Sequence, residues 1–223
     1  CGDFHQDPDK AKTYLWFHMT MGLRQTAEDS IGWNVPELVF RYGIKGRLMA
    51  TQGITVTQGV NTHELASIYN LFDVHILPTK REGFGLPILE SMACGVPNIA
   101  TNYSACVELI EQGGGELIDV ETYVCDTHFE AESAIVSVKS AVEKLDKLFG
   151  DPKLRKEISR QSRAFAQSMK WDDQIPEWIE VLFGVLGRDA PRRTVDHAPS
   201  LVGNGNNNDD AAELLDEVGV GTG

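Results

Sequence analysis

The sequence contains no long apolar run, no cysteine pair and no excess of basic residues. No segment reaches the roughly 20 consecutive apolar residues of a membrane-spanning helix, so no transmembrane segment is predicted. The four cysteines form no C-x-x-C pair, which leaves a metal site or a thioredoxin-like redox site without support. Unpaired thiols are typical of a reducing compartment, and a cytoplasmic location is therefore predicted.

The charge balance is strongly acidic. The 20 Lys and Arg residues are outnumbered by 33 Asp and Glu residues, and the net charge is −13. Such a chain is poorly suited to bind a nucleic-acid backbone or an anionic membrane surface, so neither is predicted as a partner. An anionic ligand would have to be held by backbone N–H groups or by a local basic cluster.

The first ten residues, CGDFHQDPDK, contain neither an initiator methionine nor a basic-then-apolar leader. A signal peptide is therefore not predicted, and the start is interpreted as a cut through a longer protein. The composition, 42% hydrophobic and 24% charged, is that of an ordinary globular protein.

Short apolar runs alternate with helical patterns between Thr13 and Ile118. Asn34, Thr62 and Ser104 are predicted to cap helices, because their side chains accept hydrogen bonds from the first turn. The predicted strands cover residues 13–19, 47–51, 73–77, 97–101 and 116–118, and the predicted helices cover residues 36–42, 62–71, 87–94 and 104–111. This order predicts an α/β protein with a Rossmann-like parallel sheet flanked by helices.

The pattern changes after Val120. Long amphipathic helices are predicted over 130–148 and 152–166, followed by a last helix that contains Trp178. The predicted organisation is a Rossmann-like domain over 1–170, a C-terminal helix over 171–188 and an acidic tail over 189–223 that is rich in Asn and Gly. The tail has few apolar side chains and is predicted to be disordered.

The most informative segment runs from Pro78 to Glu90 as a strand end, a glycine-bearing loop and a helix start. Gly83 and Gly85 permit positive φ and a close approach of the backbone to a ligand. Pro87 suits the first helical turn, where its missing N–H has no role. A loop of this kind lies at the carboxyl edge of a parallel sheet, where ligands bind.

The backbone of this loop predicts an anion site. The N–H groups of Phe84, Gly85 and Leu86 are left free just before and within the first turn of the helix. Together with the helix dipole they suit a phosphate group, so an acidic protein can bind a diphosphate without a basic surface.

Two carboxylates, Glu82 and Glu90, bracket the same segment. A carboxylate accepts hydrogen bonds from vicinal hydroxyls, so the pattern predicts phosphate on the amides and sugar hydroxyls on the acids. A purely structural interpretation stays open, because G-x-G alone is a weak signal and a Glu in the first helical turn often only compensates the helix dipole.

The residues from His63 to Asp73, and the later stretch EGFGLPILESMACGVPNIATNYSA, resemble the donor-binding half of glycosyltransferase family 4. That family has the two-domain GT-B architecture. Its signature is a Glu, seven residues and a second Glu, with G-F-G-L-P between them and a small-residue A-C-G-V-P after them. Glu82 and Glu90 occupy the two acidic positions.

The resemblance implies roles for individual residues. Glu82 would be the catalytic residue that contacts and positions the donor sugar, and Glu90 would hold the ribose hydroxyls. The residues implied in donor binding are Gly83, Phe84, Gly85, Leu86 and Glu90. The family uses nucleotide-diphosphate sugars, retains the anomeric configuration and generally needs no metal or other cofactor.

The resemblance also implies partners outside this chain. A hexose would pass to a glycan, lipid-linked or protein acceptor held by an N-terminal domain, and the last helix would cross to that domain. The family's diphosphate-clamping Arg and Lys would precede Cys1, and Lys80 and Arg81 do not match them. The chain alone is therefore expected to be inactive. The alternative is a non-catalytic module of GT-B origin that binds a nucleotide sugar or a partner.

His18 is a further donor-binding candidate. It ends the first predicted strand, on the side of the sheet where donors bind. A polar contact to the ligand and a hydrogen-bonded histidine under a loop are both compatible with this position, and both interpretations stay open.

Overall fold

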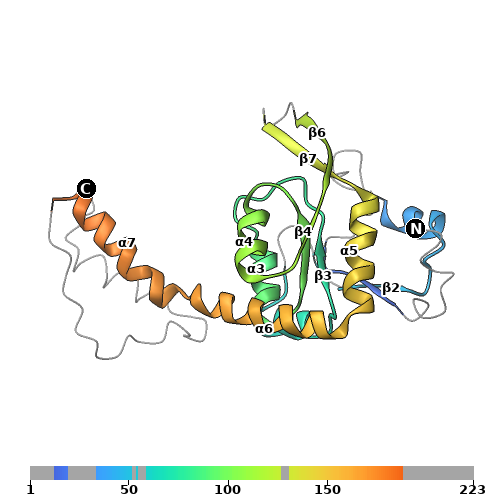
Figure 1. Ribbon diagram of the computed structural model, residues 1–223, viewed down its shortest axis with the longest axis horizontal. Helices are drawn as coiled ribbons and strands as arrows, with labels where there is room; N and C mark the ends of the chain where they lie inside the picture. The colour runs from blue at the N-terminus through green and yellow to red at the C-terminus, as the bar shows by residue number, and fades with distance from the viewer. Residues whose placement is uncertain (1–12, 20–33, 52–53, 55–58, 127–130, 188–223) are drawn as a thin grey trace. The chain divides into compact units, whose positions relative to one another are not determined.

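The computed structural model describes residues 13–19, 34–51, 54, 59–126 and 131–187 (Figure 1). The chain divides into two compact units, Cys1–Lys170 and Trp171–Gly223. In the second unit the described helix is α7 (Trp171–Val185). The tail predicted over 189–223 lies outside the described residues. Among the described residues, every helix is too short or too polar to cross a membrane.

Up to Ile118, the first unit alternates strands and helices as the sequence predicts. Its described elements in chain order are β1 (Leu15–Phe17), α1 (Val35–Arg41), β2 (Leu48–Ala50), α2 (Thr62–Tyr69), β3 (His75–Leu77), α3 (Leu86–Ala93), β4 (Asn98–Thr101), α4 (Ala105–Gly113), β5 (Glu116–Ile118), β6 (Val120–Asp126), β7 (Ala131–Val136), α5 (Val138–Gly150) and α6 (Pro152–Ser168). Strands β3, β4 and β5 form a parallel sheet in that order, with α3 and α4 as the connections. This arrangement confirms the predicted Rossmann-like α/β fold.

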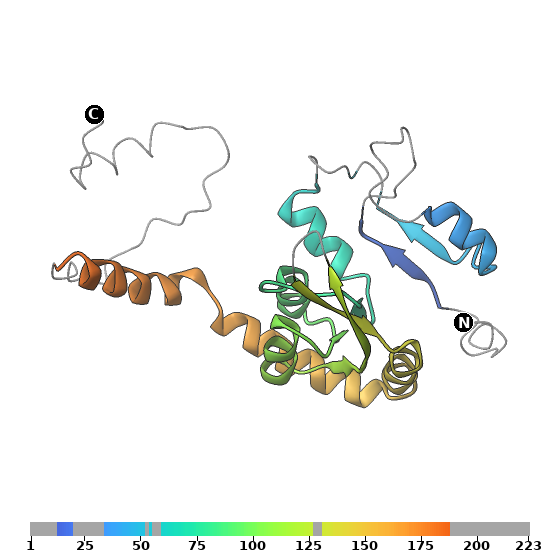
Figure 2. The same ribbon diagram turned by 90° about the horizontal axis from the view of Figure 1, so that it is seen from above.

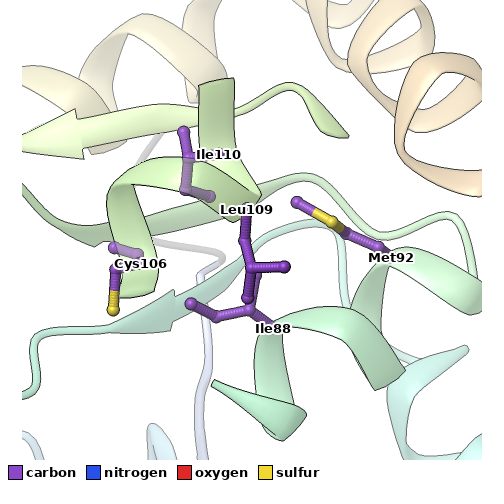
Figure 3. Close-up of a cluster of buried hydrophobic side chains, with 6 residues drawn as sticks. Ile88, Met92, Cys106, Leu109 and Ile110 are labelled. Atoms are coloured by element: carbon purple, nitrogen blue, oxygen red, sulfur yellow. The ribbon is translucent and has the colours of Figure 1, made fainter. Parts of the chain in front are cut away.

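The two faces of the central sheet carry two separate hydrophobic clusters, since successive side chains of a strand point to opposite faces. Ala100 of β4 packs against α3 and α4, whereas its neighbour Ile99 packs toward α5 and α6. Figure 1 shows α3 and α4 on one face and α5 on the other. The first cluster includes the labelled side chains of Figure 3, which are Ile88, Met92, Cys106, Leu109 and Ile110.

Helix α6 contributes to both clusters, with Ile158 in one and Phe165 against the other. It runs along the edge at which the strands begin. Ser162 donates a hydrogen bond of 2.9 Å to the carbonyl of Gly113, just before β5. The helix thus covers the amino edge of the sheet and leaves the carboxyl edge to the loops that follow the strands.

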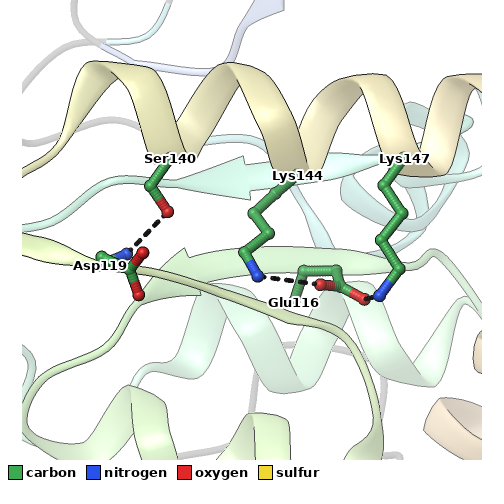
Figure 4. Close-up of polar contacts among 5 residues, drawn as sticks. All are labelled: Glu116, Asp119, Ser140, Lys144 and Lys147. Carbon is green, nitrogen blue, oxygen red and sulfur yellow. Dashed lines mark hydrogen bonds and ion pairs between the residues drawn. The ribbon is translucent and has the colours of Figure 1, made fainter.

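Glu116 is a nearly buried acid at the start of β5. Its carboxylate accepts a hydrogen bond of 2.6 Å from Lys147, and the ammonium of Lys144 lies 3.5 Å from its other oxygen (Figure 4). The Ser140 hydroxyl accepts a hydrogen bond of 3.1 Å from the backbone N–H of Asp119. These polar contacts fasten α5 to β5 and compensate the charge of a carboxylate that would be costly to bury alone.

Strands β1 and β2 form a second, two-stranded parallel sheet, and α1 connects them (Figure 2). The rings of Trp16 and Phe72 lie 6.2 Å apart, which brings β1 against the end of α2. In the described part of the chain, the predicted parallel strands are therefore divided over two sheets.

The predicted helix over 130–148 is wrong in its first part. Residues Ala131–Val136 form β7, which pairs with β6 in an antiparallel hairpin, and the helix begins at Val138. Ser133 and Ala134 are buried, and the Ala134 amide donates to the carbonyl of Lys80 at 2.9 Å. Pairing and burial decide the outcome here, because a short apolar run fits a strand as well as a helix.

The predicted capping chemistry is confirmed at Asn34 and is wrong at Thr62 and at Ser104, whose side chain makes no hydrogen bond to the first turn of α4. Asn34 caps α1 by accepting a hydrogen bond of 3.2 Å from the Glu37 amide. Helix α2 is capped by Asn61 and not by Thr62, which is its first helical residue. Asn61 accepts from the Glu64 amide at 3.0 Å, and the Glu64 carboxylate accepts from the Asn61 amide at 3.3 Å. This reciprocal capping box favours Asn61 as the start.

His75 in β3 is half-buried and hydrogen-bonded. Its Nδ1 lies 2.7 Å from Oδ1 of Asn98, whose Nδ2 donates to the Val96 carbonyl at 2.9 Å. Because that Asn98 oxygen is an acceptor, Nδ1 of His75 is the donor. Burial lowers the pKa of His75 below its usual value of 6.5, since the imidazolium loses hydration, and the Asn98 contact opposes part of this shift.

We expect acidification to destabilise the fold partly through His75. The pKa of His75 is lower in the folded than in the unfolded chain, so as the pH falls the histidine of the unfolded chain is protonated at a higher pH. Stability is therefore full above the unfolded pKa and falls as the pH drops toward the folded one. Urea unfolding at about pH 7.5 and about pH 5.5 should show a smaller acid-induced loss in His75→Gln than in the wild type.

His63 provides the control for this measurement, because it is an exposed histidine in α2. His63→Gln should keep the full acid-induced loss. An equal pH dependence in His75→Gln and in the wild type would contradict the assignment.

Candidate functional site

The candidate site is built on the loop between β3 and α3, at the carboxyl edge of the central sheet. Hydrogen bonds within the loop and from neighbouring elements hold it in place. Thr101 donates to the carbonyl of Thr79 at 2.6 Å, and the Thr79 hydroxyl donates to the carbonyl of Arg81 at 3.0 Å. The Lys80 carbonyl accepts the hydrogen bond from Ala134 of β7. The loop is thus held by Thr101 of β4, by its own residue Thr79 and by strand β7 of the β6–β7 hairpin.

The start of α3 presents free backbone donors. Gly85 is the N-cap residue, with φ 91°, and no side chain caps the helix. The amides of Phe84, Gly85 and Leu86 donate to no acceptor among the described residues. Phe84 is 43% and Leu86 61% exposed. The arrangement has the form of the anion site predicted from the sequence, with N–H groups at the positive end of a helix dipole.

The two glycines of the loop differ. Gly85 adopts the positive φ that the sequence predicts, whereas Gly83 does not. A Cβ atom on Gly85 would lie 3.0 Å from Cδ1 of Leu109 and 3.4 Å from Cδ1 of Ile88, whereas a Cβ atom on Gly83 would meet nothing within 4 Å. Backbone conformation and packing therefore require glycine at position 85 but not at position 83.

We expect Gly85→Ala to destabilise the fold by about 1–2 kcal/mol, because a side chain at positive φ is strained and this one is also crowded. Gly83→Ala is the matched control and should change the stability by less than about 0.5 kcal/mol. Urea unfolding of both variants measures the difference, and equal effects would refute this account of the loop.

Glu82 lies on the α4 side of the loop. Its backbone N–H donates a hydrogen bond of 2.9 Å to the hydroxyl of Ser104, the residue before α4. Burial raises the pKa of the Cys106 thiol to about 11, and the nearby Glu82 carboxylate adds to the shift. The Glu82 side chain thus lies close to the first turn of α4.

Glu90 lies on the α2 side. Its carboxylate accepts a hydrogen bond of 3.2 Å from the hydroxyl of Tyr69, which also lies 3.2 Å from the carbonyl of Pro87. Tyr69 is only 6% exposed, and burial together with the Glu90 charge raises its pKa above the usual value. The phenol therefore stays protonated and remains a donor to Glu90.

The structure thus places the two predicted carboxylates on either flank of the loop and helix α3. It adds Tyr69 and Ser104, which sequence reasoning did not select as site residues. In the sequence, Tyr69 stands out only as a polar side chain on the apolar face of the predicted helix 62–71, and the position of Ser104 predicts only an ordinary cap. That Glu82, Glu90 and the amides line a single cleft stays a prediction.

His18 lies at the end of the β1–β2 sheet and is exposed. Its Nδ1 is 3.0 Å from the Thr51 hydroxyl, which also accepts a hydrogen bond of 2.9 Å from the Trp16 indole. The histidine is therefore held by a partner from the neighbouring strand, and its role in donor binding stays a prediction.

The cysteines of the described residues are unpaired; Cys106 is buried, Cys94 is partly buried and Cys125 is exposed. Cys94 and Cys106 both have a raised pKa, chiefly because burial disfavours the thiolate, so neither is an activated nucleophile. Within the described part of the chain, no group of three His, Cys, Asp or Glu side chains is placed to hold a metal ion.

The Rossmann-like part of the chain matches a known protein family. The model of the family described as "Glycosyl transferases group 1" matches residues 46–165, more than half of the 223 residues. The chain therefore belongs to that family. The matched range contains the whole segment from Glu82 to Glu90 and excludes His18.

Individual relatives agree with this assignment. The chain is 30% identical over 142 residues to a D-inositol 3-phosphate glycosyltransferase of Arthrobacter sp. (strain FB24), covering 63% of this chain and 30% of the relative. It is 29% identical over 143 residues to the capsular polysaccharide biosynthesis glycosyltransferase CapM of Staphylococcus aureus, covering 64% of this chain and 34% of the relative. The chain thus spans about a third of the length of these relatives.

The fold is also found in a solved glycosyltransferase from Rickettsia africae ESF-5. The TM-score is 0.57 at 18% identity, over 81% of this chain and 43% of the other. This likeness supports the predicted fold class.

Proposed function

We propose that this chain is the donor-binding part of a retaining glycosyltransferase of family 4, which moves a hexose from a nucleotide-diphosphate sugar to an acceptor. The observation that carries the proposal is the loop after β3. Its free amides at the start of α3 are flanked by Glu82 on one side and Glu90 on the other. Diphosphate and sugar hydroxyls are the two chemistries that such a set recognises.

The diphosphate would bind to the amides of Phe84, Gly85 and Leu86. These donors are fixed by the backbone, so they need no reorganisation as negative charge develops on the leaving group. They also allow a chain with a net charge of −13 to bind an anion. The proposed reaction therefore uses no metal ion.

Glu90 would hold the ribose hydroxyls of the nucleotide. An ionised carboxylate offers about four lone-pair sites, and the Tyr69 hydroxyl occupies only one of them. Because the tyrosine is buried and stays protonated, it fixes the carboxylate while the exposed face of Glu90 accepts from the ligand. Tyr69 thus adds a donor that orients the nucleotide contact.

Glu82 would contact the donor sugar at the reacting end. Its position is set by the hydrogen bond to Ser104, on the far side of the loop from Glu90. Transfer with retention would proceed at the front face of the sugar, with the departing diphosphate held by the loop. The acceptor, a glycan, a lipid-linked sugar or a protein, would bind to another part of the full-length protein in the cytoplasm.

Calorimetric titration of UDP, GDP and ADP onto this chain, in the presence of EDTA, tests the proposal. One of the three should bind with a measurable Kd. Glu90→Gln should weaken that binding by about ten- to 150-fold, the effect of losing one charge-assisted hydrogen bond.

Glu143→Gln is the matched control. Glu143 is an exposed glutamate on α5 with only a surface partner, Lys139, at 3.9 Å, and its replacement should leave the Kd unchanged. Absence of saturable binding by all three nucleotides, or an equal effect of both substitutions, would overturn the proposal.

A further inference from the structure

Ser104 has an unusual backbone conformation. It precedes α4 with φ 53° and ψ −148°, and it is the one non-glycine residue with positive φ among the residues that the structure describes. A side chain in this region crowds its own backbone, which makes the conformation costly for any residue except glycine. The surrounding structure must therefore hold Ser104 in place.

The hydroxyl of Ser104 is also used in an unusual way. A serine at this position ordinarily accepts a hydrogen bond from the first turn of its own helix. Ser137 does so before α5, with φ −72° and a hydrogen bond of 3.4 Å from the Ser140 amide. Ser104 makes no such bond within α4, and its hydroxyl accepts from the Glu82 amide at 2.9 Å.

Ser104 therefore has neither a relaxed backbone conformation nor a capping hydrogen bond to its own helix, and its hydroxyl binds the Glu82 amide instead. The contact joins the loop after β4 to the loop after β3, between residues that are 22 positions apart in the sequence. It fixes the backbone from which the Glu82 side chain extends. A glycine at position 104 would adopt this conformation without strain. A strained serine at a candidate site therefore indicates that its hydroxyl has a function.

We propose that Ser104 is a positioning residue, whose hydroxyl holds Glu82 in the orientation that contacts the donor sugar. This inference rests on the proposed function and adds a residue to the same site. Ser104 acts through Glu82, so its loss should affect the transfer step and spare nucleotide binding.

The test compares Ser104→Gly and Ser104→Ala in the full-length protein that contains this chain. Both variants lose the hydroxyl, but only glycine also relieves the strain. We expect Ser104→Gly to be at least as stable as Ser104→Ala while both lower kcat by about two- to tenfold, the effect of one hydrogen bond. The Kd for the bound nucleotide should stay unchanged, and the Glu82 amide should exchange its proton faster in both.

Ser137→Ala removes an ordinary cap and is the control. It should lower the stability and leave kcat unchanged. A wild-type kcat in Ser104→Gly, or an unaltered exchange rate of the Glu82 amide, would overturn the positioning role of Ser104 and leave the proposed function intact. A wild-type protein that neither binds a nucleotide nor transfers sugar would overturn the proposed function together with this inference.

Discussion

Replacement of Glu82 by alanine should lower the kcat of sugar transfer by about ten- to 150-fold and change nucleotide affinity little. The range corresponds to one charge-assisted hydrogen bond of about 1.5–3 kcal/mol, at roughly 1.4 kcal/mol per tenfold change. The measurement is steady-state kinetics on the full-length protein, with free nucleotide as a competing ligand.

The reason lies in which part of the donor changes during the reaction. The donor sugar acquires charge and alters its shape in the transition state, so a contact to it becomes stronger there and contributes to kcat. The ribose is the same in the ground state and the transition state. A contact to it stabilises both equally, and its loss raises KM with little change in kcat.

Glu90→Ala is therefore the complementary variant. It should raise KM and weaken inhibition by free nucleotide, because the carboxylate that Tyr69 orients is no longer present. If Glu82→Ala altered only nucleotide affinity and Glu90→Ala altered only turnover, the two roles would be reversed.

Much of the fold follows from local signals. The strand predicted over residues 116–118 is β5, and the Asn34 cap is placed correctly, because glycine, proline and capping residues mark these boundaries in the chain itself. The parallel order follows from the alternation of short strands and helices. These features depend on neighbours within a few residues, which a sequence pattern contains.

The hairpin β6–β7 could not be predicted in the same way. Residues Ala131–Val136 are a strand because they pair with β6 and because Ala134 binds the carbonyl of Lys80, more than 50 positions away. Their own side chains do not exclude a helix. Long-range pairing therefore determined the structure of this segment.

In the candidate site, too, local features could be predicted from the sequence and long-range contacts could not. Its motif residues lie within one short segment, so the amides at the start of α3 could be predicted from the spacing. Their partners Tyr69 and Ser104 are 21 and 22 positions away from Glu90 and Glu82 and are brought in by tertiary structure. A positive φ at a serine has no sequence signal, because serine before a helix predicts an ordinary cap.

The 223-residue chain by itself is expected to bind its nucleotide and to transfer no sugar at a measurable rate. The proposed function places the acceptor on a part of the protein outside this chain, which spans about a third of the length of its curated relatives. Holding two reactants in the reacting geometry accounts for roughly 7–11 kcal/mol of barrier lowering. Without that contribution the transfer step would be slower by several orders of magnitude, even with Glu82 and the loop in place.

A panel of nucleotide sugars and glycan acceptors, assayed with the chain and with the full-length protein at equal concentration, measures this difference. Nucleotide titration of the same sample of the chain confirms that its site is folded, so a lack of transfer cannot come from a denatured protein. Turnover by the chain that matched the full-length protein would show that the acceptor part is dispensable. Tight nucleotide binding by both, with transfer by neither, would instead identify a binding module of GT-B origin, in which Glu82 and Glu90 hold the donor without acting on it.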